Sequence, residues 1–384
     1  MTTRPYAAAR RTLSLADKLL EINWGMVALI TLIACIGFAM LYSVAGASFS
    51  PWAGRQMAYF AAGFVLLIVA ALTDIRFWMS IAYPAYIVSL VLLVAVLFVG
   101  HTALGAQRWL ELGPIQLQPS EVMKIALILA LARFLHGLSV EDVSRPLRLL
   151  IPVVMIALPA YLVLKQPNLG TTMILVADGA SLLFLAGLSW RWIVPSVAAV
   201  ATAVPLAWRF LLHDYQKQRV LTFLDPESDS LGAGWNITQA KIAIGSGGLT
   251  GKGYLQGSQS RLNFLPEKHS DFIVTNYAEE FGFVGCIALL LLFAIVIGYG
   301  VQTAVAARSQ FGRLVAMGIT LNFFFYLLIN GAMVMGLIPV VGIPMPLISY
   351  GGTAMLSVMF GFGILMSVHV HRQVEIPRHS GGII

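Results

Sequence analysis

Long runs of apolar residues, separated by short polar segments, extend from about residue 22 to residue 371. A helix needs about 20 mostly apolar residues to cross the hydrocarbon core of a membrane. The stretch from Leu314 to His371 holds no Asp, Glu, Lys or Arg, and the Gly- and Pro-rich segment 336–346 divides it into two helices. The pattern therefore predicts about ten transmembrane helices, near residues 24–45, 56–73, 78–100, 119–136, 149–165, 170–188, 192–212, 274–303, 313–336 and 345–370.

Composition supports this interpretation. Hydrophobic residues make up 59% of the chain and charged residues only 11%, whereas a soluble domain carries about 25% charged residues. Most of the surface must therefore face lipid, where only helices or a closed barrel satisfy the backbone. The apolar runs are too long for barrel strands. The sequence predicts an all-α polytopic membrane protein that forms one membrane domain over residues 1–384. Its two cysteines lie within apolar runs and indicate no disulfide framework.

The charge pattern predicts the orientation. The net charge of +7 comes from basic residues scattered between hydrophobic runs, so we attribute it to orienting loops and expect no nucleic-acid partner. A cytoplasmic N-terminus places most Lys and Arg of the short loops inside. The first apolar run is too long for a signal peptide. We expect cytoplasmic tails at 1–21 and 372–384.

The longest polar segment, residues 213–273, is then extracytoplasmic. It mixes aromatic, Gly and charged residues, which favours short helices packed against the bundle. Gly245–Gly253 resembles a phosphate-binding loop but lacks the required Gly and Ser/Thr spacing. We interpret it as a turn whose backbone approaches a substrate. Asp225–Asp229 lacks the Gly and distal Glu of a calcium loop and is typical of a capping turn.

Two short segments carry candidate chemistry on the outer side. Trp109 is either an interfacial anchor or a contact to a lipid-linked sugar, with Arg108 near a phosphate. Gln118-Pro119-Ser120-Glu121 opens the fourth helix, where Pro suits the first helical position. Glu121 and Lys124 are three residues apart and share a face. They form a buried salt bridge, line a polar cavity, or do both.

Two carboxylates are harder to interpret. Asp178 stands alone in the sixth predicted helix, and the sequence shows no partner for it. Asp271 follows Lys268, His269 and Ser270 at the start of the eighth helix. Ser270 or Asp271 could be a helix N-cap. Alternatively, the carboxylate of Asp271 takes a proton from a sugar hydroxyl or holds a divalent cation.

The dispersed motifs together resemble the SEDS family of RodA and FtsW proteins over essentially the whole chain. The segments 224–229 and 242–248 look more like the RodA branch. The chain departs from the family pattern in three places: Ser270 stands where Thr is usual, Asn168 where Asp is common, and Val274–Tyr277 where a run of small apolar residues is usual. The matching motifs are Gly105–Trp109, Gln118–Lys124, Leu265–Ile273, Asn330, Gly336-Leu337, Pro339, Gly342 and Pro346–Ala354.

The resemblance implies a peptidoglycan glycosyltransferase of the bacterial inner membrane that polymerises lipid II during cell elongation. Its implied partners are a class B penicillin-binding protein, which is a transpeptidase, and the elongation machinery. Asp271 is then the essential carboxylate, as a base or as a ligand of Mg²⁺ or Mn²⁺, and no organic cofactor is expected. The implied substrate-binding residues are Arg108, Trp109, Gln118, Ser120, Glu121, Lys124, Lys268 and His269.

Two other functions fit some of these features. A lipid II flippase would also use intramembrane charges and interrupted helices, but it needs a polar path to the inner face. The polar residues visible in the sequence gather on the outer half. A membrane scaffold for a transpeptidase would not require Asp271.

Overall fold

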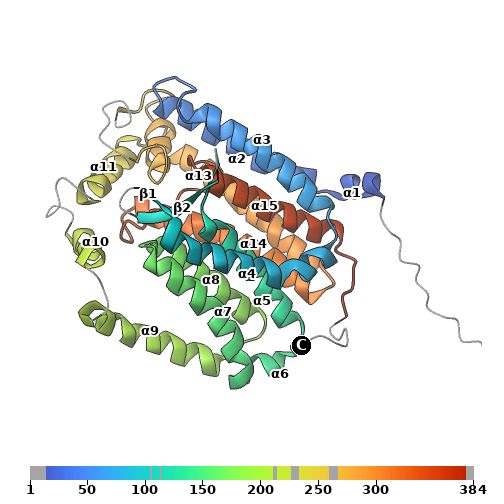
Figure 1. Cartoon of the computed structure of the whole chain (residues 1–384). Helices are drawn as coiled ribbons and strands as arrows, with labels where there is room; N and C mark the ends of the chain where they lie inside the picture. Colours follow the sequence, from blue (N-terminus) through green and yellow to red (C-terminus); the bar gives the residue numbers. More distant parts are fainter. Residues whose placement is uncertain are drawn as a thin grey trace, which may run out of the picture.

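Helices form nearly all of the regular structure, as the hydrophobic pattern predicts (Figure 1). The computed structural model describes residues 14–103, 106–112, 115–210, 214–225, 233–258 and 267–377. Its elements are α1 (Leu15–Glu21), α2 (Trp24–Val44), α3 (Ala53–Leu72), α4 (Ile75–Val99), β1 (His101–Ala103), β2 (Ala106–Leu112), β3 (Ile115–Leu117), α5 (Pro119–His136), α6 (Val140–Val143), α7 (Pro146–Lys165), α8 (Leu169–Leu185), α9 (Trp190–Phe210), α10 (Asp214–Leu224), α11 (Ala233–Ser246), α13 (Ile273–Ala306), α14 (Gln310–Val334) and α15 (Gly352–Val370).

Each of the ten predicted transmembrane ranges coincides with a helix: α2 to α5, α7 to α9 and α13 to α15. Among the described residues, 7 of these helices are long and apolar enough to cross a membrane. The 17-residue α8 is shorter, and the 18-residue α5 carries Glu121, Lys124 and Arg133. The chain is a helical, multi-pass membrane protein.

α5 lies at the centre of the bundle. It packs against α4, α8 and α14, and most of its residues, polar ones included, are buried. A helix enclosed on all sides needs no polar face, and its few charged side chains must find partners inside the protein. This position makes α5 the natural place for a buried polar site.

α3 and α15 form the most extensive helix pair. Gly63 of α3 lies against Met359, and Gly363 of α15 lies against the backbone of Leu67. A Cβ on Gly363 would come within 2.7 Å of the Leu67 carbonyl oxygen. Small residues allow helix backbones to approach closely in a membrane, so these glycines bring the C-terminal helix against α3.

The structure differs from the predicted pattern in two places. The segment between the third and fourth predicted helices forms, in its described residues 101–103, 106–112 and 115–117, an antiparallel sheet in the order β1-β2-β3, with Trp109 paired to His101 and Leu110 to Leu117. β1 and β3 have 3 residues each and are too short for a periodicity signal. The last helix begins at Gly352 rather than near residue 345, because Pro346 lacks an N–H and Leu347 has a left-handed φ of 68°.

The predicted short helices of the outer loop are present in its described parts. α11 packs against α13 and α14, and α10 against α11. Residues 226–232 and 259–266 lie outside the described residues, so the proposed capping turn is described only at Asp225. The turn at Gly245–Gly253 packs on α13: a Cβ on Gly251 would lie 2.1 Å from the Glu280 carbonyl oxygen. Gly251 therefore allows a close approach to α13, and the approach of this turn to a substrate stays a prediction.

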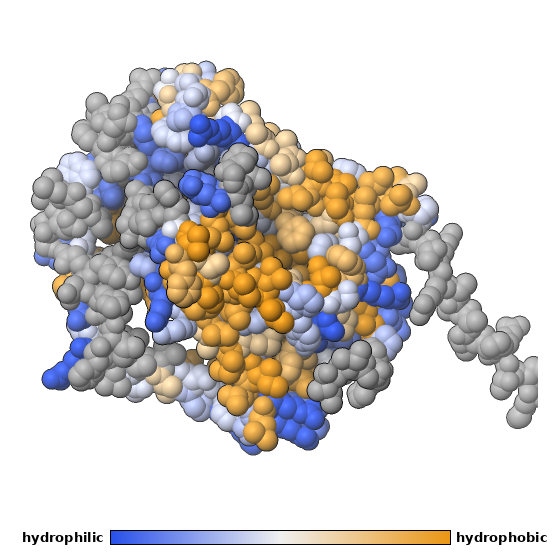
Figure 2. All heavy atoms as spheres, viewed as in Figure 1, coloured by the Kyte–Doolittle hydropathy of each residue, from blue (hydrophilic) through white to orange (hydrophobic). Residues whose placement is uncertain are grey.

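Polar and apolar side chains separate along the bundle. Figure 2 shows hydrophobic side chains over the middle of one face and hydrophilic ones towards the two ends. The sheet, α10 and α11 lie at one end, and α1, α6 and the end of α15 at the other (Figure 1). At that second end Arg372 forms an ion pair with Glu21 at 2.8 Å. The described parts of both terminal segments thus share one end, while residues 1–13 and 378–384 lie outside the described residues.

Candidate active site at one end of α5, α13 and α14

Asp271 lies in the turn of residues 267–272 that leads into α13. The N-cap residue of α13 is Phe272, and no side chain caps the helix there. The interpretation of Ser270 or Asp271 as the cap is therefore wrong. Asp271 is partly exposed, and its Oδ2 lies 3.3 Å from where a Cβ on Gly342 would be. The carboxylate faces the segment between α14 and α15.

Asn330, near the end of α14, holds this turn in place. Its Nδ2 donates to the carbonyl oxygen of Asp271 at 2.9 Å and to that of Ile343 at 2.7 Å. Asn330 is fully buried. Two hydrogen bonds from one buried amide fix the backbone of Asp271 relative to both α14 and the following segment.

The segment before α15 holds the same turn from the other side. Ser349 Oγ donates to the Ser270 carbonyl oxygen at 2.6 Å, and the Tyr350 N–H donates to the His269 carbonyl oxygen at 2.9 Å. Gln56 of α3 in turn donates to Ser349 O at 3.0 Å and accepts from Gly351 N at 3.2 Å. The predicted C-terminal motif and the Asp271 motif are therefore one structural unit.

His269 and Lys268 lie beside Asp271 in the chain. The His269 ring stacks on Trp52, with centroids 4.5 Å apart and an interplanar angle of 10°, and Tyr350 lies 5.9 Å away. Burial lowers the pKa of His269, which the charge of Glu267 partly offsets, so the imidazole is neutral at pH 7. Burial also lowers the pKa of Lys268. Lys268 is thus a partly desolvated cation that lies a few positions before Asp271 in the sequence.

Glu121 and Lys124 form the predicted buried pair. Lys124 Nζ donates to Glu121 Oε1 at 2.7 Å. Both residues are buried: Lys124 is 1% exposed and Glu121 is 4% exposed. Tyr326 of α14 completes the cluster: its hydroxyl donates to Glu121 Oε2 at 2.7 Å and accepts from Lys124. The Lys124 ammonium also lies 4.1 Å from the Tyr326 ring centroid. Each charge is compensated within the protein.

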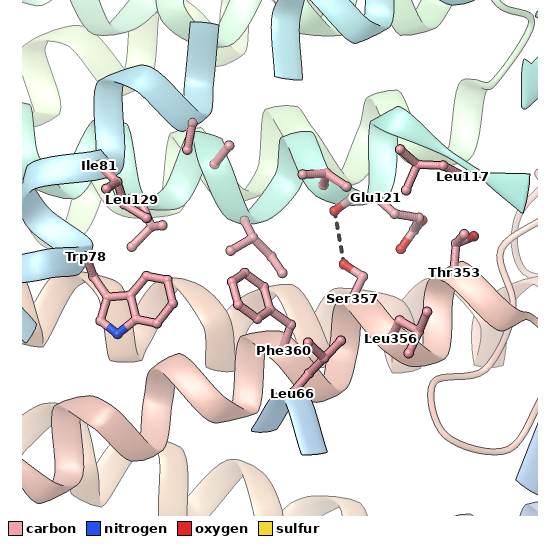
Figure 3. A pocket seen from close by; sticks show the side chains of 14 residues that line it. Leu66, Trp78, Ile81, Leu117, Glu121, Leu129, Thr353, Leu356, Ser357 and Phe360 are labelled. Atoms are coloured by element: carbon pink, nitrogen blue, oxygen red, sulfur yellow. Dashed lines mark hydrogen bonds between the residues drawn. The ribbon is translucent and has the colours of Figure 1, made fainter. Parts of the chain in front are cut away.

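Glu121 also borders a groove of about 370 Å³ between α3, α4, α5 and α15. Leu117, Glu121 and Thr353 lie at one end of it, and Trp78 and Ile81 at the other (Figure 3). Ser357 Oγ donates to the Glu121 carbonyl oxygen at 3.0 Å. The predicted salt bridge of Glu121 is confirmed, whereas the cavity beside it is not the polar one that was predicted. The groove is apolar along most of its length and suits a hydrocarbon chain.

The structure places the other predicted site residues less directly. Arg108 donates to the carbonyl oxygens of Gln166, at 3.1 Å, and of Pro167, and so ties β2 to the turn between α7 and α8. Trp109 is half-buried in β2. Gln118 is the N-cap residue of α5 without a side-chain cap, and Ser120 is buried. Substrate contacts of these four residues stay predictions.

Asp178, which had no partner visible in the sequence, is fully buried on α8. Its Oδ2 accepts from Asn322 Nδ2 of α14 at 2.6 Å. The partners are 144 positions apart, so only the fold could reveal the pair. Asn322 lies one turn before Tyr326 on the same helix.

Two buried carboxylates on α13 escaped the sequence analysis. Glu279 accepts from Lys252 Nζ at 2.6 Å and from Ser258 N at 2.9 Å. Glu280 accepts from the Ser43 hydroxyl and from Leu255 N at 3.3 Å. They fasten the outer loop to the bundle. The signal was available, because an adjacent pair of acidic residues interrupts an otherwise apolar run.

A metal ion at Asp271 would need further ligands from the bound substrate. Within the described residues no three His, Cys, Asp or Glu side chains gather as a metal site. Mg²⁺ is commonly held by one or two carboxylates together with substrate phosphates and water. Asp271 would supply the protein's carboxylate in such an arrangement, and the remaining ligands would come from substrate and water.

Comparison with known proteins agrees with this geometry. The model of the FtsW, RodA and SpoVE family of cell cycle proteins matches residues 23–374. The peptidoglycan glycosyltransferase MrdB of Escherichia coli K12 is 49% identical over 322 residues, which cover 83% of this chain and 86% of that protein. MrdB of Helicobacter pylori strain 26695 is 39% identical over 333 residues, covering 83% and 84%.

Solved structures are similar over the same range. A chain of a peptidoglycan synthase complex, studied for its coordination of polymerization and crosslinking, superposes with a TM-score of 0.80 at 32% identity. The match covers 91% of this chain and 98% of that one. The crystal structure of the rod shape determining protein RodA of Thermus thermophilus gives a TM-score of 0.69 at 29% identity, covering 91% and 97%.

Proposed function

This chain belongs to the FtsW, RodA and SpoVE family, and on that premise we propose that it is a peptidoglycan glycosyltransferase that polymerises lipid II into glycan strands during cell elongation. The observation that carries the proposal is the placement of Asp271. Its backbone is fixed by Asn330, and its turn is held by Ser349. Its partly exposed carboxylate lies at the outer end of a bundle that also contains a lipid-sized groove.

The chemistry of strand growth needs what this site offers. The 4-hydroxyl of one sugar attacks the anomeric carbon of another, a new C–O bond forms, and the bond to undecaprenyl pyrophosphate breaks. Asp271 accepts the proton of the attacking hydroxyl. Cationic groups stabilise the negative charge that develops on the departing pyrophosphate, and Lys268 is the cation nearest to Asp271 in the chain. We propose that a divalent cation held by Asp271 and the pyrophosphate would add to this stabilisation.

The groove suits the lipid part of the substrate. Substrate and leaving group both remain anchored in the membrane, so their polyprenyl chains need an apolar channel beside the reacting atoms. The groove beside Glu121 is lined mainly by residues such as Leu66, Ile125, Leu129 and Phe360. Each methylene transferred from water to an apolar surface contributes about 0.8 kcal/mol, but lipid competes for the same chain. We therefore expect the groove to orient the substrate more than to attract it.

The flippase alternative requires a polar path through the membrane. On the described face of α14, the polar side chains of Asn322, Tyr326 and Asn330 occupy the outer half. Towards the inner end the buried residues on this helix include Gly318, Val315 and Phe311. The polar stripe therefore ends in the middle of the bundle, which favours an enzyme with its site on one side.

We propose a class B penicillin-binding protein as partner, so that polymerised strands are cross-linked as they form. A second apolar groove, of about 680 Å³, runs along α13 and α14. Phe283 and Leu328 on its walls are 60% and 50% exposed. We propose this groove as a contact surface for the partner, since small residues such as Gly331 allow close helix packing.

Replacing Asp271 by Asn tests the proposal. Asn is nearly isosteric and keeps the backbone carbonyl that Asn330 binds, but it cannot accept the proton. We expect Asp271→Asn to abolish polymer formation from lipid II in detergent, because a general base contributes about 10²–10⁴-fold in rate. Flipping is impossible in detergent, so the assay reports the enzyme alone. Folding and co-purification with the transpeptidase should stay near wild type.

Asp74→Asn is a matched control, since Asp74 caps α4 at the opposite end of the bundle and accepts from Arg76 N at 2.8 Å. Asn is an equally good cap, so this variant should polymerise normally. Normal polymer from Asp271→Asn would refute the role of Asp271, whereas the scaffold alternative predicts no polymer even from the wild-type chain. Partial recovery of that variant at high Mg²⁺ or Mn²⁺ would favour a metal ligand over a base.

A further inference from the structure

Three polar side chains follow one face of α14 at a spacing of four residues: Asn322, Tyr326 and Asn330. Residues four apart lie one above the other on a helix. Asn322 binds Asp178 on α8 at 2.6 Å, Tyr326 binds Glu121 on α5 at 2.7 Å, and Asn330 binds the Asp271 carbonyl oxygen at 2.9 Å. A single helix face therefore connects three acidic residues that belong to three separate elements.

The middle contact is the strongest of the three. The Tyr326 hydroxyl and the Lys124 ammonium each bind Glu121 and also bind each other. All three residues are at most 4% exposed. Hydrogen bonds to charged groups are stronger than neutral ones, and a low-dielectric surrounding strengthens them further. This closed triangle fixes α14 to α5 at one defined height and rotation.

Asn330 fixes the Asp271 turn relative to α14. It lies one helical turn beyond Tyr326, and its amide donates hydrogen bonds to the carbonyl oxygens of both Asp271 and Ile343. α5 meanwhile presents Glu121 at the end of the lipid-sized groove. The contact between Tyr326 and Glu121 therefore sets where the Asp271 turn lies relative to the groove.

We propose that Tyr326 is a positioning residue for glycosyl transfer, which holds Asp271 in register with the groove through α14 and Asn330. Tyr326 acts through other residues and does not touch the reacting atoms. The inference rests on the proposed function, because it assumes that Asp271 is the reacting carboxylate. The contact between Asn322 and Asp178 anchors the inner end of the same face.

Tyr326→Phe removes the hydroxyl and keeps the ring, and the purified full chain is assayed for lipid II polymerisation. A displacement of about 1 Å at a catalytic group can cost about 10²-fold in rate, so we expect kcat to fall about tenfold or more. KM should change little, since the groove itself is intact. The assay is run well below the melting temperature of every variant, so that loss of folded protein does not enter kcat.

Tyr86→Phe is the matched control. The Tyr86 hydroxyl also makes one interhelical hydrogen bond, to the Met155 carbonyl oxygen at 2.9 Å, and joins α4 to α7 away from the α14 face. It should lower the melting temperature while leaving kcat unchanged. If Tyr326→Phe likewise loses stability but keeps kcat, its role is structural and the proposal is overturned.

A second variant covers the case in which Tyr326→Phe does not fold. Asn330→Ala removes the hydrogen bond from Asn330 to the Asp271 carbonyl oxygen. The proposal requires this variant to lower kcat as well. An unchanged kcat would overturn the proposal. Combining the two changes should lower kcat no further than the larger single effect, because both act through one path. Failure of the proposed function is recognised separately, by the absence of polymer from the wild-type chain.

Discussion

At the scale of single residues, two carboxylates near the outer end have different surroundings. Asp271 is partly exposed and faces Gly342, whereas Glu121 is buried and binds both Lys124 and Tyr326. A base must reach its substrate. The proposed base is therefore Asp271, whereas the buried Glu121 side chain joins α5 to α14.

The sequence could predict the pair of Glu121 and Lys124 but not its third member. A spacing of three residues places two side chains on one helix face whatever the fold. Tyr326 lies 205 positions from Glu121, and nothing in its neighbourhood distinguishes it from other aromatic residues of a membrane helix. The contacts of Asn330 and Ser349 with the Asp271 turn were likewise beyond reach. The family resemblance grouped these motifs without explaining why they belong together.

The buried pair makes a stability prediction. Lys124→Ala removes the cation and leaves the Glu121 carboxylate uncompensated, which should lower the free energy of unfolding by about 3–5 kcal/mol. The double variant Glu121→Gln with Lys124→Met removes both charges while keeping much of the volume, and should unfold at a higher temperature than Lys124→Ala. Thermal unfolding in detergent measures both. Equal melting temperatures for the wild type and all variants would mean that the two groups are solvated and do not interact.

At the scale of elements, the most informative helix is α13. Its backbone breaks at Gly282, where φ is 65° and ψ is −164°. The groups released by the break are bound by the glycine-rich turn: Phe283 N donates to Gly248 O at 2.9 Å, and Lys252 N donates to Glu279 O at 3.0 Å. Backbone groups in a membrane need such partners. The break and the turn therefore stabilise each other.

Helix existence was predictable, whereas such interruptions were not. Ten apolar runs gave ten helices because the thickness of the membrane sets their length. The same runs hid the break in α13, since an isolated Gly within a helical pattern is a weak signal. The sheet of β1, β2 and β3 was also missed, because strands of 3 residues such as β1 and β3 show no periodicity. These features depend on contacts between segments and not on local pattern.

Two glycines of α13 provide a matched test of the break. A Cβ on Gly282 would lie 2.3 Å from Gly251 N, whereas a Cβ on Gly298 meets no atom within 4 Å. Gly282→Ala should lower stability by at least about 1–3 kcal/mol from the left-handed backbone alone. Gly298→Ala should be neutral or stabilising, by up to about 1 kcal/mol, from helix propensity. Melting temperatures in detergent compare them, and equal effects would argue against a fixed break.

At the scale of the whole molecule, the arrangement places chemistry at one end. The Asp271 turn, the sheet and α11 lie together, and the ends of the described chain meet at the opposite end through Glu21 and Arg372 (Figure 1). An even number of membrane crossings requires both termini on one side, and this ion pair agrees with that. The distribution of Lys and Arg predicts that this side is cytoplasmic. A cell-wall polymerase needs its site on the other side, where the strands are assembled.

Cysteine labelling tests this orientation. In a background with Cys35 and Cys286 replaced by Ala, a single Cys is placed at Gln256 or at Glu141, which are exposed polar positions at opposite ends of the bundle. An impermeant maleimide added to intact spheroplasts should label Gln256→Cys at once, because this residue belongs to the outer loop. It should label Glu141→Cys only after the membrane is permeabilised. Both positions are exposed, so both thiols should react equally in detergent. A difference in intact spheroplasts therefore reports the side of the membrane and not the burial of the thiol. The reverse pattern in intact spheroplasts would place Asp271 on the cytoplasmic side, where it could not build an external glycan strand, and the proposed function would fall together with the orientation.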